Sequence, residues 1–233
     1  MLILQLLLNG LQTGAVYALT AAGFALIFGA TRIFHFAHGT TFTLAGYAFL
    51  MSWQAGWPVW IGTILSFAIA IGFGIAMERF VYRPLQRHEG SFFTVFVAAF
   101  GVAIVVQNLI GMVAGRGLAT VESPLSFSRE LLPEVFVAPM LWIAIGVAAV
   151  LFVALTLFLT KSYAGVALRA LAQNPDLLRA YGLSANRISV LAFAIGSALA
   201  TPAAIVPALI SGLSAAVGRQ VMRISMAAPI VGG

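Results

Sequence analysis

Two histidines, His35 and His38, are the first candidates for chemistry in this 233-residue sequence. On a helix, a spacing of three residues places both imidazoles on one face, where they could bind a metal ion. Structural and catalytic metal sites need at least one further nitrogen, sulfur or carboxylate ligand, and neither Asp, Glu nor Cys stands nearby. We therefore expect no metal site here, and hydrogen bonds from both rings to neighbouring helices instead.

Nucleotide hydrolysis also lacks its motif. The single lysine, Lys161, is followed by Ser162, but Thr160 occupies the position where a phosphate-binding loop requires glycine. The sequence contains no G-x-S-x-G elbow, no pair of intramembrane Asp residues and no cysteine. We expect a protein that is not an enzyme and needs no cofactor of its own, so that any ATP-driven motor must be a separate chain.

Polar side chains within apolar runs are candidates for a solute path. Gln107 and Asn108 stand in the run 92–114, and His38 and Thr41 stand in the weakly apolar run 34–53. Polar residues in such segments face other helices or a water-filled cavity rather than lipid. Two interpretations stay open, namely hydrogen bonds between helices and a polar patch on a translocation path.

The long apolar runs make the chain a membrane protein. It is 62% hydrophobic and only 8% charged, with a mean hydropathy of +1.06, whereas soluble domains carry about 25% charged residues. The basic residues are scattered through short loops, so the net charge of +6 does not indicate nucleic-acid binding. We predict one all-α membrane domain over 1–233, with six or seven spans of roughly 20 residues: 2–28, 34–53, 58–77, 92–114, 139–159 and 188–210, with a last segment at 221–233.

Small residues recur every four positions in the first span, which predicts a ridge for close helix packing: Gly10, Gly14, Ala18 and Ala22. In the sixth span, Pro202 and Pro207 predict a kink. A first cytoplasmic loop is expected at 78–91, with Glu78 and Arg83 forming contacts at the mouth of the bundle.

The segment 161–187 is a polar island between two apolar runs. Asn174 is a good N-cap, Pro175 suits the first helical position, Asp176 favours the positive end of the helix dipole, and Gly182 can end the helix. This predicts a short helix outside the bilayer, and an apolar face on it would need a protein partner. We expect that face to hold Leu177, Leu178 and Tyr181.

The charges and the tryptophans indicate the same orientation. If the island is cytoplasmic, that side carries most of the basic residues, and the tryptophans fall near the outer ends of the spans. The N-terminus is then expected outside. The cytoplasmic basic residues are Arg32, Arg79, Arg83, Arg87, Lys161, Arg169, Arg179 and Arg187; the outer ones are Arg116, Arg129, Arg219 and Arg223; the tryptophans are Trp53, Trp57, Trp60 and Trp142.

Several of these stretches resemble the bacterial high-affinity branched-chain amino acid ABC transporter permeases of the LivH type. The resemblance covers essentially the whole chain and includes NGLQTGAVYALTAAGFALIFGATRIFHFAHG at 9–39, ERFVYRPL at 78–85, LAFAIGSALA at 191–200 and the island. Asp176 to Gly182 is a loose form of the E-A-A-x-x-x-G pattern, with Asp in place of Glu, and His35 stands where the family usually has Asn. Family members continue with further spans, so we expect this sequence to lack the C-terminal ones.

The resemblance implies the permease subunit of an importer in the bacterial inner membrane. It implies a second permease subunit of the LivM type, two cytoplasmic ATPases that bind ATP, and a periplasmic or lipid-anchored solute-binding protein, with leucine, isoleucine or valine as solute. It also implies that the island docks on the ATPases through Gly165, Arg169, Asp176, Leu177, Leu178, Arg179, Tyr181 and Gly182. Two alternatives stay open: a related importer for urea or short amides, and a stand-alone channel or facilitator.

Overall fold

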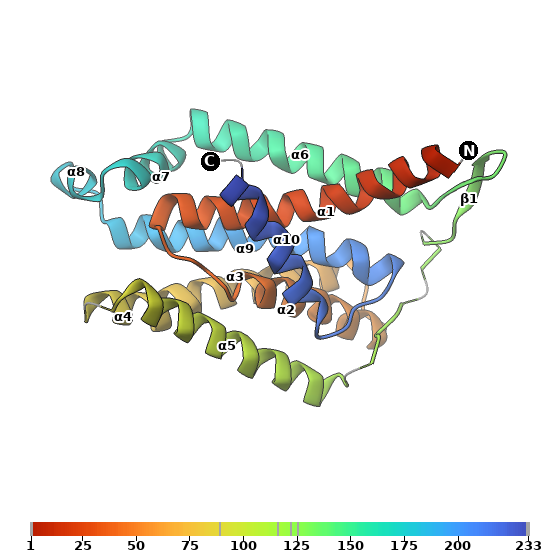
Figure 1. Cartoon of the computed structure of the whole chain (residues 1–233), viewed down its shortest axis with the longest axis horizontal. Helices are drawn as coiled ribbons and strands as arrows, with labels where there is room; N and C mark the ends of the chain where they lie inside the picture. The colour runs from red at the N-terminus through yellow and green to blue at the C-terminus, as the bar shows by residue number, and fades with distance from the viewer. Residues whose placement is uncertain (1, 89, 116, 122, 125, 232–233) are drawn as a thin grey trace.

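The computed structural model describes residues 2–88, 90–115, 117–121, 123–124 and 126–231. It is a bundle of long helices, as predicted (Figure 1). Five helical stretches in the described residues are long and apolar enough to cross a membrane: Leu2–Thr31 (α1), Val59–Arg87, Phe92–Val113 (α5), Pro139–Lys161 (α6) and Ala185–Ile210 (α9).

Helix α2, His38–Gln54, is shorter and more polar than these five, and most of its residues are buried. It packs against α3 (Val59–Ala76), α9 and α5. Because its threonines and histidines are enclosed by other helices, their polarity does not meet lipid. The prediction that this segment faces other helices is confirmed.

Helix α9 lies at the centre and packs against α1, α2 and α3. Small residues allow this close approach: a Cβ atom at Gly23 of α1 would overlap the carbonyl oxygen of Gly196, and one at Gly74 of α3 would overlap the hydroxyl of Ser197. Helix α9 is assigned as one helix through Pro202 and Pro207. The predicted kink stays a prediction.

The predicted loop 78–91 is mostly helical, which corrects the sequence-based boundary. A π-helix, Met77–Tyr82 (η1), and a short helix, Arg83–Arg87 (α4), continue α3. Pro84 lacks the N–H for an ordinary helical hydrogen bond, and the wider π-turn accommodates such a break. The arginines of this segment suggested a polar loop. Long basic side chains can, however, extend from the end of a helix towards water, so they do not exclude a helix.

Two short helices, α7 (Tyr163–Gln173) and α8 (Pro175–Ala180), precede α9. After α9, helix α10 (Val217–Val231) turns back and packs on α1 and α2. A two-stranded antiparallel hairpin, not predicted from the sequence, is formed by Arg129–Leu132 (β1) and Val135–Val137 (β2). Gln5 fixes it to α1 by exchanging two hydrogen bonds with the backbone of Phe136, of 2.8 and 2.7 Å.

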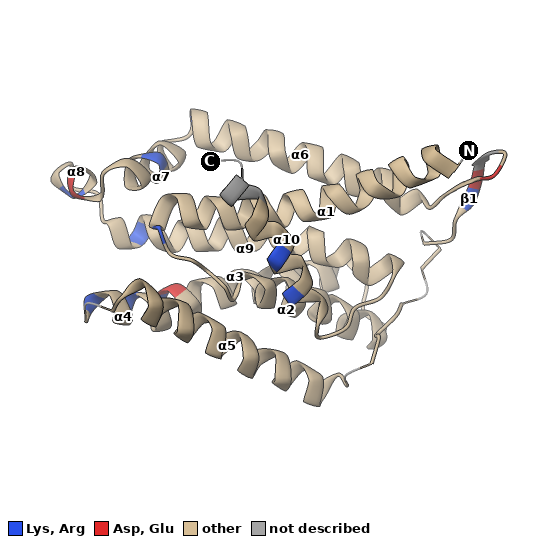
Figure 2. Cartoon of the chain, viewed as in Figure 1, with Lys and Arg blue, Asp and Glu red and all other residues tan. Residues whose placement is uncertain are grey.

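Most lysine and arginine residues lie at the end of the bundle formed by α4, α7, α8 and the start of α9 (Figure 2). The hairpin and the N-terminus lie at the opposite end (Figure 1). This separation is the charge asymmetry that the positive-inside rule needs. Arg219 departs from its predicted place in an outer loop, because it lies on α10 and hydrogen-bonds Gln107 of α5.

Candidate coupling surface and buried polar sites

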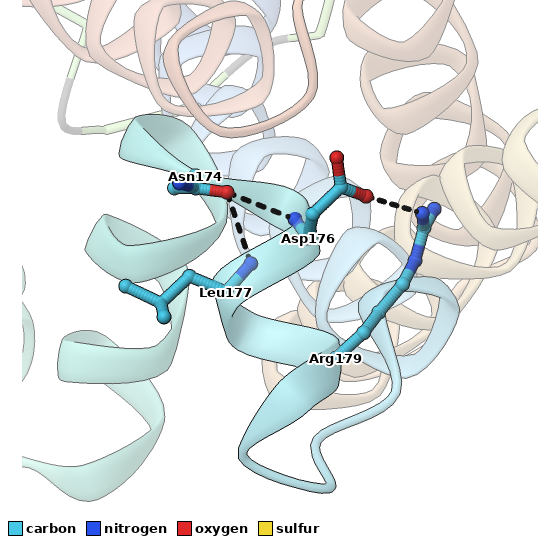
Figure 3. Close-up of polar contacts among 4 residues, drawn as sticks. All are labelled: Asn174, Asp176, Leu177 and Arg179. Atoms are coloured by element: carbon cyan, nitrogen blue, oxygen red, sulfur yellow. Dashed lines mark hydrogen bonds and ion pairs between the residues drawn. The ribbon is translucent and has the colours of Figure 1, made fainter.

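Helix α8 is capped as the sequence predicts. The Oδ1 atom of Asn174 accepts hydrogen bonds from the backbone nitrogens of Asp176 and Leu177, at 3.1 and 2.9 Å (Figure 3). Pro175 opens the helix, and Gly182, with φ of +78°, follows its end in the left-handed conformation that glycine adopts without strain. The six-residue helix is therefore specified by local chemistry at both ends.

The two charged residues of α8 bind each other. Arg179 Nη1 donates to Asp176 Oδ1 at 2.9 Å, and both side chains are well exposed (Figure 3). An exposed pair of this kind adds little stability, typically about 0.3–0.5 kcal/mol between neighbours on a helix. The pair leaves the second carboxylate oxygen of Asp176 and the remaining N–H groups of Arg179 exposed to water.

The predicted apolar face of α8 needs one correction. Leu178 is only 3% exposed and packs between α1, α7 and α9, in a cluster with Ala30, Leu168 and Ala192. Leu177 and Tyr181 are 53% and 78% exposed. Adjacent helical residues lie about 100° apart, whereas positions four apart share a face. Leu178 therefore anchors α8 to the bundle, and the exposed apolar pair is Leu177 and Tyr181.

An apolar groove of about 520 Å³ lies between α7 and α8, and we call it the α7–α8 groove. Tyr163, which is 97% exposed, opens α7 at its edge. An exposed apolar patch beside charged residues is typical of a protein interface. Its lining residues are Tyr163, Ala164, Val166, Ala167, Ala170, Gln173, Asn174, Leu177, Leu178, Tyr181, Leu183 and Ile188.

Two other predicted coupling residues lie away from this groove. Gly165 is buried in the first turn of α7, where a Cβ atom would overlap the carbonyl oxygen of Phe158, so its smallness is a packing requirement. Arg169 lines a different cavity, of about 390 Å³, together with Leu26 of α1 and Leu155 of α6. The structure therefore assembles Leu177 and Tyr181 at the groove, and separates Arg169 from them.

The four predicted path residues have different surroundings, and their role in a path stays a prediction. His38 is buried, and its Nε2 atom lies 3.1 Å from the carbonyl oxygen of Thr20. Thr41 is buried beside its own helix, within 3.4 Å of the carbonyl oxygen of Ala37. His38 fits the alternative of hydrogen bonding between helices, whereas Thr41 bonds within its own helix. The sequence correctly indicated that these polar side chains avoid lipid. The sequence of one segment cannot show that other helices bury them on every side.

Gln107 and Asn108 point in different directions. Gln107 is buried and accepts a 2.6 Å hydrogen bond from Arg219 Nη1. It lines a cavity of only about 40 Å³, which is too small for an amino acid. Asn108 is exposed, and its amide donates to the carbonyl oxygen of Ile104 one turn earlier.

The predicted small-residue ridge on α1 is not the packing face within this chain. Cβ atoms at Gly10 and Gly14 would have no neighbouring atom within 4 Å, and Ala18 and Ala22 are only half-buried. The close contact between helices instead uses Gly23 with Gly196. A four-residue repeat predicts that a helix has a small face, but which face meets a neighbour depends on the rest of the bundle.

The site formed by Glu78 and Arg83 is more deeply buried than the sequence indicates. Glu78 in η1 is 2% exposed and lies 3.9 Å from Arg83 Nη2, so the predicted contact at the mouth of the bundle is present. Tyr82, one turn later, is buried with its hydroxyl 2.6 Å from His35 Nδ1. The π-turn directs both side chains inward, and the sequence carries no clear signal for such a turn beyond Pro84.

Comparisons with known proteins agree with this architecture. The family model described as "Branched-chain amino acid transport system / permease component" matches residues 6–233. The chain is 31% identical over 215 residues to the high-affinity branched-chain amino acid transport system permease protein BraD of Pseudomonas aeruginosa, covering 87% of this chain and 69% of that protein. It is 28% identical over 221 residues to the permease protein LivH of Escherichia coli, with the same coverage of 87% and 69%.

A more distant likeness links the chain to a protein named for another solute. It is 26% identical over 207 residues to the fructose import permease protein FruF of Bifidobacterium longum, covering 83% of this chain and 52% of that one. No solved structure matches. The family model covers nearly the whole chain, and its helices are those of a multi-pass membrane protein. The chain is a member of the branched-chain amino acid transport system permease family.

Proposed function

We propose that this chain is the permease subunit of an ATP-driven importer for branched-chain amino acids in the bacterial inner membrane. Its family membership over residues 6–233 and the printed names of BraD and LivH support the solute class. The sequence has no phosphate-binding loop at its single lysine, Lys161, and the proposal assigns ATP hydrolysis to partner subunits.

The observation that carries the proposal is the α7–α8 groove. It lies at the end of the bundle that is rich in arginine, which is the cytoplasmic side by the positive-inside rule. There Leu177, Tyr181 and Tyr163 present apolar surface to water with no partner among the described residues. A cytoplasmic ATPase subunit would cover this surface by binding α8 in a complementary cleft, as amphipathic helices bind grooves elsewhere.

The packing of α8 supports transmission of its movement to the membrane-spanning helices. Leu178 contacts the cluster that includes Ala30 near the end of α1 and Ala192 in the first half of α9. A push on α8 therefore moves the two helices with the most extensive mutual packing in the bundle. ATP-driven closure of the ATPase pair would reorient α1 and α9 against a second permease subunit, which is alternating access by rocking of helices.

A cavity towards the opposite end is a better candidate than His38 and Thr41 for this subunit's share of the solute path. It measures about 430 Å³ and lies between α1, α9 and α10. Polar residues on a membrane helix are expected to face water or protein, and α1 contributes Asn9, Gln12, Thr13 and Tyr17 to its lining. A solute-binding protein would deliver the amino acid to this side.

Uptake by the assembled transporter tests the proposal. The chain is reconstituted with its second permease, ATPases and binding protein, and leucine uptake is measured for Leu177→Asp combined with Tyr181→Asp. Uptake should fall to background while membrane insertion is kept, because both side chains are exposed and not needed for folding. Phe127→Asp, at an exposed residue outside the groove, is the matched control and should transport normally.

Unchanged uptake by the double variant refutes the docking role. Solute exchange through the isolated chain without ATP would instead identify a stand-alone facilitator. Selective uptake of urea, with no uptake of leucine, would assign the chain to an importer for short amides.

A further inference from the structure

A polar cavity of about 610 Å³ lies next to α8, on the side of the helix away from the α7–α8 groove. Segments far apart in the sequence enclose it: the end of α1, η1, the end of α7, α8 and the start of α9. We call it the Glu78 cavity. Its lining combines the charged residues Arg32, Glu78 and Arg179 with an apolar wall made of Ala30, Ile33, Leu171, Ala172, Pro175 and Ala185.

Glu78 provides a buried carboxylate that is only partly satisfied: the Ser189 side chain hydrogen-bonds it, but one of its two oxygens lacks a partner in the described part of the chain. Its Oε2 atom is buried and has no hydrogen-bond partner among the described residues. Its Oε1 atom is 3.9 Å from Arg83 Nη2, but that guanidinium makes its short hydrogen bond, of 3.0 Å, to the carbonyl oxygen of Asn186. A buried carboxylate oxygen without a donor is costly, so the site favours a ligand that brings a cationic N–H group.

Arg32 provides a free cation in the same cavity. Its side chain makes no hydrogen bond or ion pair within the described part of the chain, in contrast to Arg179, which is bound to Asp176 at 2.9 Å. Arg32 also has φ of +57°, the left-handed backbone conformation in which glycine is favoured over residues with a Cβ atom. Glycine would therefore adopt this backbone conformation with less strain than arginine does.

We infer that the Glu78 cavity binds a free aliphatic α-amino acid from the cytoplasmic side, with its ammonium group at Glu78 and its carboxylate at Arg32. The free Oε2 atom of Glu78 and the guanidinium of Arg32 have the opposite signs that a zwitterion needs, and the apolar wall suits a short aliphatic side chain. The assignment rests on the proposed function, because it takes the imported solute as the ligand. The site is distinct from the cavity between α1, α9 and α10, which is lined by other residues.

The Glu78 cavity lies between α8 and the bundle, so a bound amino acid would affect the movement of α8. Pro175 and Arg179 of α8 form one side, and Glu78 of η1 forms another. An amino acid held between them would fix α8 against the bundle. Because α8 must move for uptake, accumulated amino acid in the cytoplasm would slow the importer, which is feedback by the product.

Direct binding tests the site. The purified chain in phosphatidylcholine nanodiscs is titrated calorimetrically with L-leucine, with 3-methylbutylamine, which lacks the carboxylate, and with 4-methylpentanoate, which lacks the ammonium group. Leucine should bind tightest. Arg32→Gly should weaken leucine binding by about tenfold or more and remove its advantage over the amine, since a charge-assisted contact is lost. This variant relieves the positive φ, so loss of folding does not explain the result.

Two further variants complete the test. Glu78→Gln should remove the advantage of leucine over 4-methylpentanoate, and Arg87→Ala, at an exposed arginine of α4 outside the cavity lining, should change nothing. Equal leucine binding by wild type, Arg32→Gly and Glu78→Gln overturns the assignment. Phosphatidylethanolamine has an ammonium and an anionic group as well; if nanodiscs of that lipid abolish leucine binding, the headgroup is the occupant and the amino-acid assignment is wrong.

Transport separates this inference from the proposed function. With the complete importer in vesicles, leucine on the ATPase side should inhibit uptake by wild type and leave Arg32→Gly uninhibited, while both have similar initial rates. Uptake of leucine with equal inhibition in both proteins refutes the feedback site alone. Absence of leucine uptake from wild type under conditions where another solute is carried refutes the proposed function instead.

Discussion

Replacing Leu178 with alanine should loosen α8 without changing its exposed surface. The leucine is 3% exposed and packs among small and aliphatic side chains from α1, α7 and α9. Truncating a buried leucine costs about 2–5 kcal/mol, depending on how far the neighbours relax. Ala30, Ala167 and Ala192 in this cluster have no side chains that can move to fill the gap. We therefore expect a loss of at least about 2 kcal/mol in the docking of α8.

The matched control is Leu177→Ala, one residue earlier on the same helix. Leu177 is 53% exposed, so its truncation should change stability by no more than about 0.5 kcal/mol. The two variants change the same atoms in the same helix, and they differ only in which side of α8 the leucine occupies. Leu177→Ala should weaken binding of the ATPase subunit, whereas Leu178→Ala should first disturb the chain itself.

Hydrogen exchange of the isolated chain measures the difference. A loss of about 2 kcal/mol corresponds to about a thirtyfold faster exchange for amides protected only by docking of α8. The backbone amides of Leu178 and Leu183, which bond the carbonyl oxygens of Asn174 and Leu178, are suitable reporters. Exchange that is equally fast in both variants, or unchanged in Leu178→Ala, would refute the anchoring role of Leu178.

Three further changes test separate parts of the structure. Asn174→Ala should destabilise α8 by about 1 kcal/mol because two backbone donors lose their acceptor, and Asn174→Asp should restore protection of the same amides in hydrogen exchange. Gly23→Val should prevent close packing of α1 on α9 and reduce the yield of folded protein on size-exclusion chromatography, while Gly14→Val, at a glycine with open space around it, should not. Gln107→Leu should leave Arg219 without its acceptor and lower thermal stability in detergent by the equivalent of about 1.5–3 kcal/mol; a variant with unchanged melting would show that α10 does not depend on this contact.

The helical bundle and the cap of α8 could be predicted because both follow from short-range rules. Span length depends on the hydropathy of consecutive residues, and the cap depends on Asn174, Pro175 and Gly182 within one short segment. The hairpin was missed because it is short and lies in a polar loop. The helical continuation at 78–87 was missed because its arginines resemble a loop in composition.

The candidate site was predicted only in part, because the facing of each side chain depends on distant segments. Leu178 turns inward since α1 and α9 supply its neighbours, and Gln107 meets Arg219 across 112 residues of sequence. Gly23 and Gly196 likewise become a close contact only when two helices are brought together. The burial of the Glu78 carboxylate depends on the assembled cavity, whereas the sequence shows only a glutamate near arginines.

The exposed side of α8 can be tested directly because the sequence contains no cysteine, so a single introduced thiol is the only labelling site. The variant Tyr181→Cys is treated with a membrane-impermeant maleimide in right-side-out and inside-out vesicles, with and without the ATPase subunits. The account predicts labelling only from the cytoplasmic side, and protection when the ATPases bind. Labelling from the outer side, or cytoplasmic labelling that the ATPases do not reduce, would contradict the claim that α8 is the docking element of a permease driven by a separate motor.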